Sequence, residues 1–402
     1  MRSATSGCWA GAGALVALLV SACATASVPP APAVLDLEAQ ERALRARVGA
    51  HGDAPVAELV ARVTATLLTD AERAARTPDV VVLRDPTIAA FVVPSGRIYL
   101  HTGLLARLGN EAQLAVVLGR ALTQAARRAD VARGSAIDDA LLAMREAVGA
   151  SLATPDAAVA VVSPAGEAIL GRRLDVIYMA AVIGDGRDLE SDADAGALGR
   201  LVRAGYDPKE APRAFERLRR EAKAGGQIER FFLGRDAVLA ERIETLTRLV
   251  ARDHALAAAA PGTSVNTREF DEAIVVVARD NARLELQAGR FRAAEDQLDR
   301  ALSLSPGDAR AHLVLGELHR LRAQRARGAA DRDDLARRAL AAYERAEQLD
   351  PTLSEVARQT GLLYYQQGQR ARAREAFARY LASQPDAPDA ARVREYLAAL
   401  SP

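Results

Sequence analysis

The last third of this 402-residue chain repeats itself, and this constrains the fold more than any other feature. Pro306, Pro351 and Pro385 each close a unit. The last two lie 34 residues apart and the first two 45 apart, which is 34 plus an insertion of 11. The same small and large positions recur: Gly289, Ala294, Leu298 and Ala301 in the first unit, Gly316, Ala339, Tyr343 and Ala346 in the second, and Gly361, Tyr364, Gly368, Ala373 and Phe377 in the third. The pattern predicts stacked helix pairs that approach closely at small residues.

This pattern resembles the tetratricopeptide repeat, which implies an α-solenoid of about three repeats over residues 268–402. The insertion falls in the Arg-rich stretch Arg322 to Asp334, between the two helices of the middle repeat. The helix after Pro388 is expected to cap the stack. An unrelated Ala-rich helical bundle is the alternative.

In such a solenoid the first helix of each pair lines a concave groove. The side chains expected in this peptide-binding groove are Arg279, Arg283, Arg310, Glu317, Arg320, Arg358 and Tyr365. Because the set is mostly positive, acidic segments or C-terminal carboxylates are the expected ligands. The alternative is that these arginines only reflect the composition of the protein.

Composition excludes several other classes of protein. The chain has 53 Lys+Arg against 52 Asp+Glu, so no overall basic field indicates a nucleic-acid partner. Aromatic residues make up only 4%, so small aliphatic residues build the core, which favours helices. The two cysteines are Cys8 and Cys23, which leaves no disulfide framework and no cysteine zinc site in the body of the protein.

The N-terminus carries an export signal. The apolar run Trp9 to Val20 is too short to span a bilayer and ends in Ser21-Ala22-Cys23. It resembles a bacterial lipobox, which implies that residues 1–22 are removed, that Cys23 is lipidated, and that the protein is periplasmic and anchored in the outer membrane. Residues 23–35 are expected to form an extended tether. An ordinary signal peptide with an incidental Cys23 is the alternative.

Residues 36–254 mix helices with one short β region. Val80 to Leu83 is a β-branched run, and two further runs, Ala89 to Val93 and Arg97 to Leu100, flank a Pro94-Ser95-Gly96 turn. These runs predict a small β meander with a hairpin. Asn110 is expected to cap the helix that follows.

The order of these segments resembles the zinc metallopeptidases that include HtpX and BepA. That family has a Gly-Leu-Leu segment (Gly103 to Leu105 here), a Leu-Gly-His-Glu-x-x-His helix, a later Arg-x-x-Glu-x-x-Ala-Asp and an Ala-Gly-Tyr-Asp-Pro (204–208 here). The resemblance implies a zincin-like α+β metallopeptidase domain over 36–254, joined by a linker at 255–267 to the repeats. The expected fold is therefore mainly α, with one small sheet.

The zinc chemistry of that family is missing. Arg120, Ala121 and Gln124 stand where the family places its first histidine, its glutamate and its second histidine. Because an arginine cannot deprotonate and an alanine cannot act on a water, the sequence predicts neither zinc nor catalysis. The third-ligand position is kept as Glu190, followed by Asp194. The alternative for these two acids is a solvated helix face.

Two hypotheses concern the electrostatics of this degenerate site. A substitute metal site could be built from His101, Glu190 and Asp194, against the alternative that His101 is an ordinary strand-end histidine. In the second hypothesis, the Arg120 guanidinium supplies the positive charge that the metal would otherwise supply. It does so through a salt bridge to Glu190, alone or shared with Asp194.

The leading functional prediction is a pseudopeptidase: a lipid-anchored periplasmic protein that binds envelope proteins or extended peptides as a chaperone or scaffold, without cutting them. An edge strand beside the helix that carries Arg120 is expected to pair with extended peptides, as in the resembling peptidases. An active zinc metalloendopeptidase in envelope protein quality control is one alternative, and a purely structural repeat scaffold is another. No cofactor is expected unless the first alternative holds.

Overall fold

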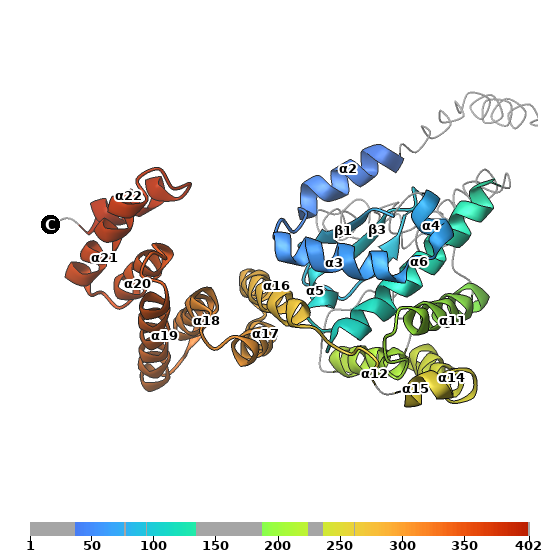
Figure 1. Ribbon diagram of the computed structural model, residues 1–402. Coiled ribbons are helices and arrows are strands. Elements are labelled where there is room, and N and C mark those ends of the chain that lie inside the picture. Colours follow the sequence, from blue (N-terminus) through green and yellow to red (C-terminus); the bar gives the residue numbers. More distant parts are fainter. Residues whose placement is uncertain are drawn as a thin grey trace, which may run out of the picture.

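The computed structural model describes residues 37–75, 78–93, 95–133, 187–223, 236–260 and 262–400. Figure 1 shows a part that contains a small sheet and the helices α2 to α15, and an arm of paired helices, α16 to α22, that extends from it. The fold is mainly helical, as the sequence predicts. The predictions for the signal peptide, Cys23 and the tether lie outside the described residues.

The sheet has three strands, β1 (Val80–Leu83), β2 (Ala90–Val92) and β3 (Ile98–His101), in the order β1-β3-β2. The β2–β3 hairpin is confirmed, but the predicted meander is wrong, because β1 pairs with β3 in parallel. The turn after β1 gives the reason. The Thr87 amide donates to the Asp85 side chain at 2.8 Å, and Pro86 cannot donate to a ladder, so the chain leaves the sheet before β2 begins.

The helices of the first part are α2 (Leu37–Val48), α3 (Ala54–Leu67), α4 (Asp70–Ala75), α5 (Thr102–Leu105), α6 (Glu111–Arg133), α11 (Arg187–Arg203), α12 (Glu210–Lys223), α14 (Asp236–Asp253) and α15 (Ala255–Ala259). Because side chains alternate along a strand, the sheet has two apolar faces. One face packs Phe91 and Tyr99 against Leu44 of α2, and the other packs Ile98 and Leu100 into the main core with α3 and α6.

Helix α6 is the longest of the first part and lies against α11 (Figure 1). Asn110 caps it as predicted, since the Gln113 amide donates to the Asn110 side chain at 2.9 Å. Small residues let α6 and α11 approach each other. A Cβ on Gly119 would lie 3.3 Å from Cα of Ala197, and a Cβ on Gly196 would lie 2.6 Å from the Thr123 side chain. This contact places residues 120 and 124 of α6 opposite α11.

The arm consists of three helix pairs and a terminal helix, α16 (Arg268–Gln287), α17 (Phe291–Leu304), α18 (Ala309–Arg325), α19 (Ala329–Leu349), α20 (Glu355–Gln366), α21 (Arg370–Ser383) and α22 (Ala390–Ala399). The predicted packing of small against large residues is present. A Cβ on Gly316 would lie 2.3 Å from the Tyr343 ring, and one on Gly361 would lie 2.6 Å from the Phe377 ring. The 11-residue insertion lengthens α18 and α19, since only residues 326–328 separate them.

The segment expected to be a linker, residues 255–267, contains α15 and then lies along the start of α6. The Ala112 amide donates to the Val265 carbonyl at 2.9 Å. Helix α16 then packs on α3 and α5, and its Phe270 and Ile274 belong to the same core as the first part. The first repeat is therefore built into the first part of the molecule.

None of the helices within the described ranges has both the length and the apolar character needed to cross a membrane.

Candidate functional site

Three helices bring a buried carboxylate and two arginines together around Arg120, where the family resemblance predicts the first metal ligand. Arg120 of α6 donates from Nε to Oδ1 of Asp194 on α11 at 2.9 Å. Arg242 of α14 donates from Nε to Oδ2 and from Nη2 to Oδ1 of the same carboxylate, each at 2.8 Å. We call these three residues the Asp194 ion cluster. Their exposed fractions are 5%, 4% and 8% for Arg120, Asp194 and Arg242.

The Asp194 ion cluster also packs against an aromatic ring of a fourth helix. The Arg242 guanidinium also lies 4.4 Å from the centre of the Phe215 ring of α12, in cation–π geometry. Removing one member of a buried ion pair typically costs roughly 3–5 kcal/mol, because the remaining charge keeps its desolvation penalty. The cluster therefore fastens α6, α11 and α14 to one another.

These residues do not fit zinc. Zinc needs lone pairs from imidazole, thiolate or carboxylate groups, and a guanidinium offers none. Arg120 occupies the first ligand position, Ala121 beside it is buried, and both Asp194 oxygens accept hydrogen bonds from arginine. Among the side chains that the structure describes, no group of three His, Cys, Asp or Glu residues could hold a metal ion.

The two acids of α11 lie one helical turn apart. The solvated-face alternative is wrong for Asp194, which is buried and ion-paired. The side chain of Glu190 lies outside the described residues, so its predicted bridge to Arg120 stays a prediction. The salt bridge from Arg120 to Asp194, which the same hypothesis allows, is present: Arg120 Nε lies 2.9 Å from Asp194 Oδ1.

His101 does not join Asp194 in a metal site. It is fully buried at the end of β3, where its Nδ1 lies 2.8 Å from the Thr87 hydroxyl and 3.8 Å from an Asp85 oxygen. Burial lowers the pKa of His101, which favours the neutral ring. The strand-end alternative describes this histidine better than the substitute metal site.

Arg242 is the member of the Asp194 ion cluster that the sequence patterns did not reveal. It lies on the buried face of α14, in register with Leu239, Leu246 and Val250. An arginine at an apolar position of an amphipathic helix is a signal, because a buried guanidinium needs an acidic partner. That partner is 48 residues away in the sequence, so periodicity alone could not name it.

The Ala-Gly-Tyr-Asp-Pro segment has a structural role beside the site. The Tyr206 hydroxyl donates to Glu111 at 2.7 Å, and Arg62 of α3 donates to both oxygens of the same carboxylate at 2.9 and 2.7 Å. Thr267 also donates to Glu111. Burial alone would raise the pKa of Glu111, but these hydrogen bonds lower it overall. The buried carboxylate thus ties the first turn of α6 to α3 and to the segment before α16.

The residues expected in the repeat groove differ in their surroundings. Arg310 and Tyr365 are exposed as expected. The expectation that the whole set lines an open surface is wrong for Glu317 and Arg320, which are only 9% and 8% exposed. The reason is that α18 lies between α16 and α20, whose Arg283 and Gln359 both donate hydrogen bonds to Glu317.

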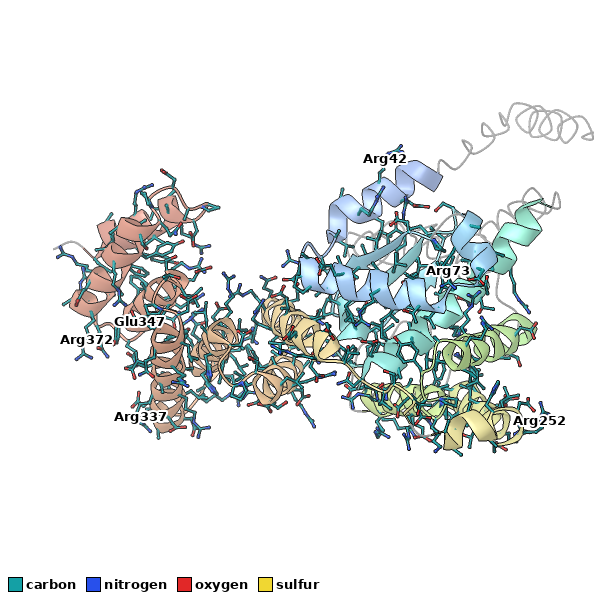
Figure 2. All side chains as sticks on the ribbon, viewed as in Figure 1. Arg42, Arg73, Arg252, Arg337, Glu347 and Arg372 are labelled. Carbon is teal, nitrogen blue, oxygen red and sulfur yellow. The ribbon has the colours of Figure 1, made fainter. Side chains whose placement is uncertain are left out.

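The other groove arginines have partners of their own. Arg279 pairs with Asp308 at 3.0 Å, Arg283 with Glu317 at 3.3 Å, and Arg358 with Asp389. Figure 2 shows Arg337 of α19 and Arg372 of α21 pointing away from the arm. The positive face of the first helices is therefore partly neutralised by internal ion pairs.

Both edges of the sheet are occupied or buried. Residues 49–51 pair with β1 on its outer side, where the His51 amide donates to the Val82 carbonyl at 2.8 Å. All three residues of β2, the edge strand that contacts α6, are buried. Peptide pairing at this edge stays a prediction.

With this geometry in place, sequence comparisons define the class of the protein. The family model for peptidase family M48 matches residues 55–263, just over half of the sequence, and the chain belongs to this family. A tetratricopeptide repeat model matches residues 326–398. Both findings confirm the resemblances predicted from the sequence. The molecule is an M48 peptidase-like domain followed by tetratricopeptide repeats.

A curated relative and a solved structure complete the comparison. The mitochondrial metalloendopeptidase OMA1 of Arabidopsis thaliana is 30% identical over 148 residues, which are 37% of this chain and 26% of that protein. The chain thus matches about a quarter of the length of this relative. A structure of an IFIT1 monomeric mutant with Gppp-AAAA covers 70% of this chain and 73% of that chain, with 16% identity and a TM-score of 0.25, too low to bear on the fold.

Proposed function

We propose that this protein is a zinc-free member of the M48 family that binds other proteins without cleaving them. The observation that carries the proposal is the Asp194 ion cluster, in which Arg120 occupies the first ligand position and bonds Asp194 at 2.9 Å. A member of this family that hydrolyses peptide bonds needs a metal-bound water and a general base. Ala121 supplies no base, and Arg120 supplies no ligand.

The binding half of the proposal is supported by the repeats. Tetratricopeptide repeats generally mediate protein–protein interaction, and here they are fastened to the peptidase-like domain through α16. We propose envelope proteins as the partners, in a chaperone or scaffold role.

The proposed location is the periplasm, with Cys23 lipidated and held in the outer membrane. The support for this is the lipobox-like Ser21-Ala22-Cys23 after a short apolar run. Several acyl chains on one cysteine anchor a protein stably, whereas a single acyl group does not.

Metal analysis of the purified mature protein tests the proposal. We expect no stoichiometric zinc by mass spectrometry and no chelator-sensitive cleavage of casein. The matched comparison is the triple variant Arg120→His, Ala121→Glu and Gln124→His, which restores the ligand types and is expected to carry more zinc than the natural protein. About one zinc per natural molecule, together with chelator-sensitive cleavage, would instead establish an active metalloendopeptidase, the activity that the name of the OMA1 relative states for that protein.

A further inference from the structure

The first helices of three successive repeats bring three arginines to one place. Arg283 of α16 donates to Glu317 of α18 at 3.3 Å, and Gln359 of α20 donates to the same carboxylate oxygen at 3.0 Å. Arg320 follows Glu317 by three residues, on the same face of α18. Arg358 precedes Gln359 and pairs with Asp389. We call Arg283, Arg320 and Arg358 the repeat arginine cluster.

Several buried donor atoms in and beside the cluster make no hydrogen bond of ordinary geometry to the residues that the structure describes. The Nε atoms of all three arginines are buried without a hydrogen-bond partner, as is the Tyr343 hydroxyl. Arg320 is only 8% exposed, and no carboxylate among the described residues forms an ion pair with it. Burial raises the pKa of Tyr343 and the neighbouring Arg320 lowers it, so the Arg320 guanidinium lies close to the Tyr343 hydroxyl.

This arrangement is unfavourable for a protein that uses the arginines only for packing. More than about 90% of buried polar groups in proteins have a hydrogen-bond partner, and a buried charge without one is especially costly. Three guanidiniums face two carboxylates, Glu317 and Asp389, so the cluster has one positive charge in excess. Functional sites are the usual places where a fold retains such an uncompensated charge.

The three arginines of the cluster differ in how much of each side chain is exposed to solvent. The Arg283 side chain is 41% exposed and the Arg358 side chain 27% exposed, whereas Arg320 lies deeper. An anion that comes from solvent therefore meets the two outer arginines first. Tyr365 lies two turns after Arg358 on α20, and its ring is 38% exposed, which offers an apolar contact beside the charged one.

We infer that the repeat arginine cluster binds a carboxylate of an acidic peptide segment, with Arg320 as the central donor and Arg283 and Arg358 on either side. The inference rests on the proposal that the repeats bind protein segments, and it assigns the chemistry of the ligand. An Arg fork matches a carboxylate, and charge-assisted hydrogen bonds are about twice as strong as neutral ones. The carboxylate is that of an Asp or Glu side chain or of a peptide's C-terminus, and the test separates these sources.

The first measurement selects ligands from defined pools. The full mature protein is immobilised and incubated with a random octapeptide pool that has free C-termini, and with the same pool amidated at the C-terminus. We expect the bound fraction to be enriched in Asp and Glu in both pools if side chains are recognised, and binding only from the free pool if the C-terminus is recognised. Bound peptides without either preference, or no bound peptide at all, overturn the inference.

The second measurement assigns the site. The best selected peptide is titrated by fluorescence anisotropy against Arg320→Met and against Arg345→Met, an exposed arginine of α19 that serves as the matched control. We expect Arg320→Met to weaken binding at least about tenfold and the control to leave it unchanged. Equal affinity in the two variants overturns the inference.

The thermal stability of the free protein separates binding from packing. Because Arg320 lacks a carboxylate partner among the described residues, Arg320→Met is expected to melt no lower than Arg345→Met, whereas a packing role predicts a lower Tm together with unchanged binding. If Arg320→Met does not fold, Arg320→Lys keeps the charge without the fork and is expected to bind more weakly than the natural protein. Affinity of Arg320→Lys equal to that of the natural protein would then contradict the assignment.

These results are independent of the metal test. A zinc-free, inactive protein that selects no acidic peptide leaves the proposed pseudopeptidase standing and removes only the carboxylate site. A protein that contains zinc and cleaves casein removes the pseudopeptidase proposal, while the peptide titrations still report on the repeats.

Discussion

Asp194 is the residue around which the degenerate site is organised. The sequence pattern favours Glu190 as the partner of Arg120, but the described contact is with Asp194, which also accepts two hydrogen bonds from Arg242. A buried carboxylate needs a neighbouring positive charge. Arg120 and Arg242 supply it here.

At this scale we expect Asp194→Asn to destabilise the protein more than Arg120→Met. The first change leaves two buried guanidiniums without their carboxylate, whereas the second leaves Asp194 bonded to Arg242. The loss for Asp194→Asn should be about 3–5 kcal/mol. Urea unfolding of both variants and of the double variant measures this. The double variant should lose about 1–3 kcal/mol less than the sum of the single losses, because one stranded cation is gone.

The control for this cycle comes from the same two helices. Arg127 of α6 and Asp192 of α11 form an ion pair at 2.7 Å with side chains 40% and 54% exposed. Such a pair is worth about 0–1 kcal/mol, so its variants should show little coupling. Equal coupling in the buried and the exposed pairs would show that the Asp194 ion cluster has no special role.

Among the elements, the helix pairs of the repeats show how small residues set the distance between helices. Gly316 of α18 and Tyr343 of α19 are the clearest case, because a Cβ at position 316 would lie 2.3 Å from the ring. The long side chain fills the space that the glycine leaves. The same relation holds between Gly361 and Phe377 in the next repeat.

We therefore expect Gly316→Ala to destabilise the arm, although alanine is normally the better helix former. The overlap with Tyr343 should cost about 1–3 kcal/mol, against a gain of up to about 1 kcal/mol in helix propensity. Gly199→Ala in α11 is the matched control, since a Cβ there meets only the Arg203 side chain at 3.6 Å. Thermal unfolding should show a lower Tm for Gly316→Ala and an equal or higher Tm for Gly199→Ala. A rise for both would contradict the packing described here.

On the scale of the whole molecule, the first repeat joins the two parts. Asn281 of α16 bonds the Thr102 carbonyl of α5 at 2.7 Å, and Asp280 lies 3.2 Å from His51. Arg300 of α17 donates to the carbonyls of Ala106 and Leu108, and burial lowers its pKa to about 10. These contacts hold the first repeat directly against the peptidase-like domain.

Attachment to the membrane also belongs to this scale. The proposed anchor is the lipid on Cys23, so Cys23→Ser should move the protein from the membrane fraction to the soluble fraction. Fractionation of cell envelopes at low and high salt, followed by immunoblotting, measures this. Ala24→Ser is the control and should stay with the membranes. Retention of Cys23→Ser at high salt would indicate a protein partner or another membrane contact.

Features that depend on local spacing could be predicted from the sequence. The 34-residue period, the Asn110 cap, the β2–β3 hairpin and the small-to-large packing of the repeats all follow from residues close in the sequence, where propensity and periodicity act. The replacement of the family's zinc ligands by Arg120, Ala121 and Gln124 could also be predicted, because helical spacing specifies which residues share a face.

The contacts between distant segments could not be predicted from the sequence. Arg120 is 74 residues from Asp194, and Arg242 is 48 residues from it, so no periodicity specifies that the two arginines share this carboxylate. The parallel pairing of β1 with β3 depends on a crossover, and the burial of Glu317 and Arg320 depends on the neighbouring repeats. In each case the deciding energy is desolvation and long-range packing, which a helix or a strand does not have until its neighbours are in place.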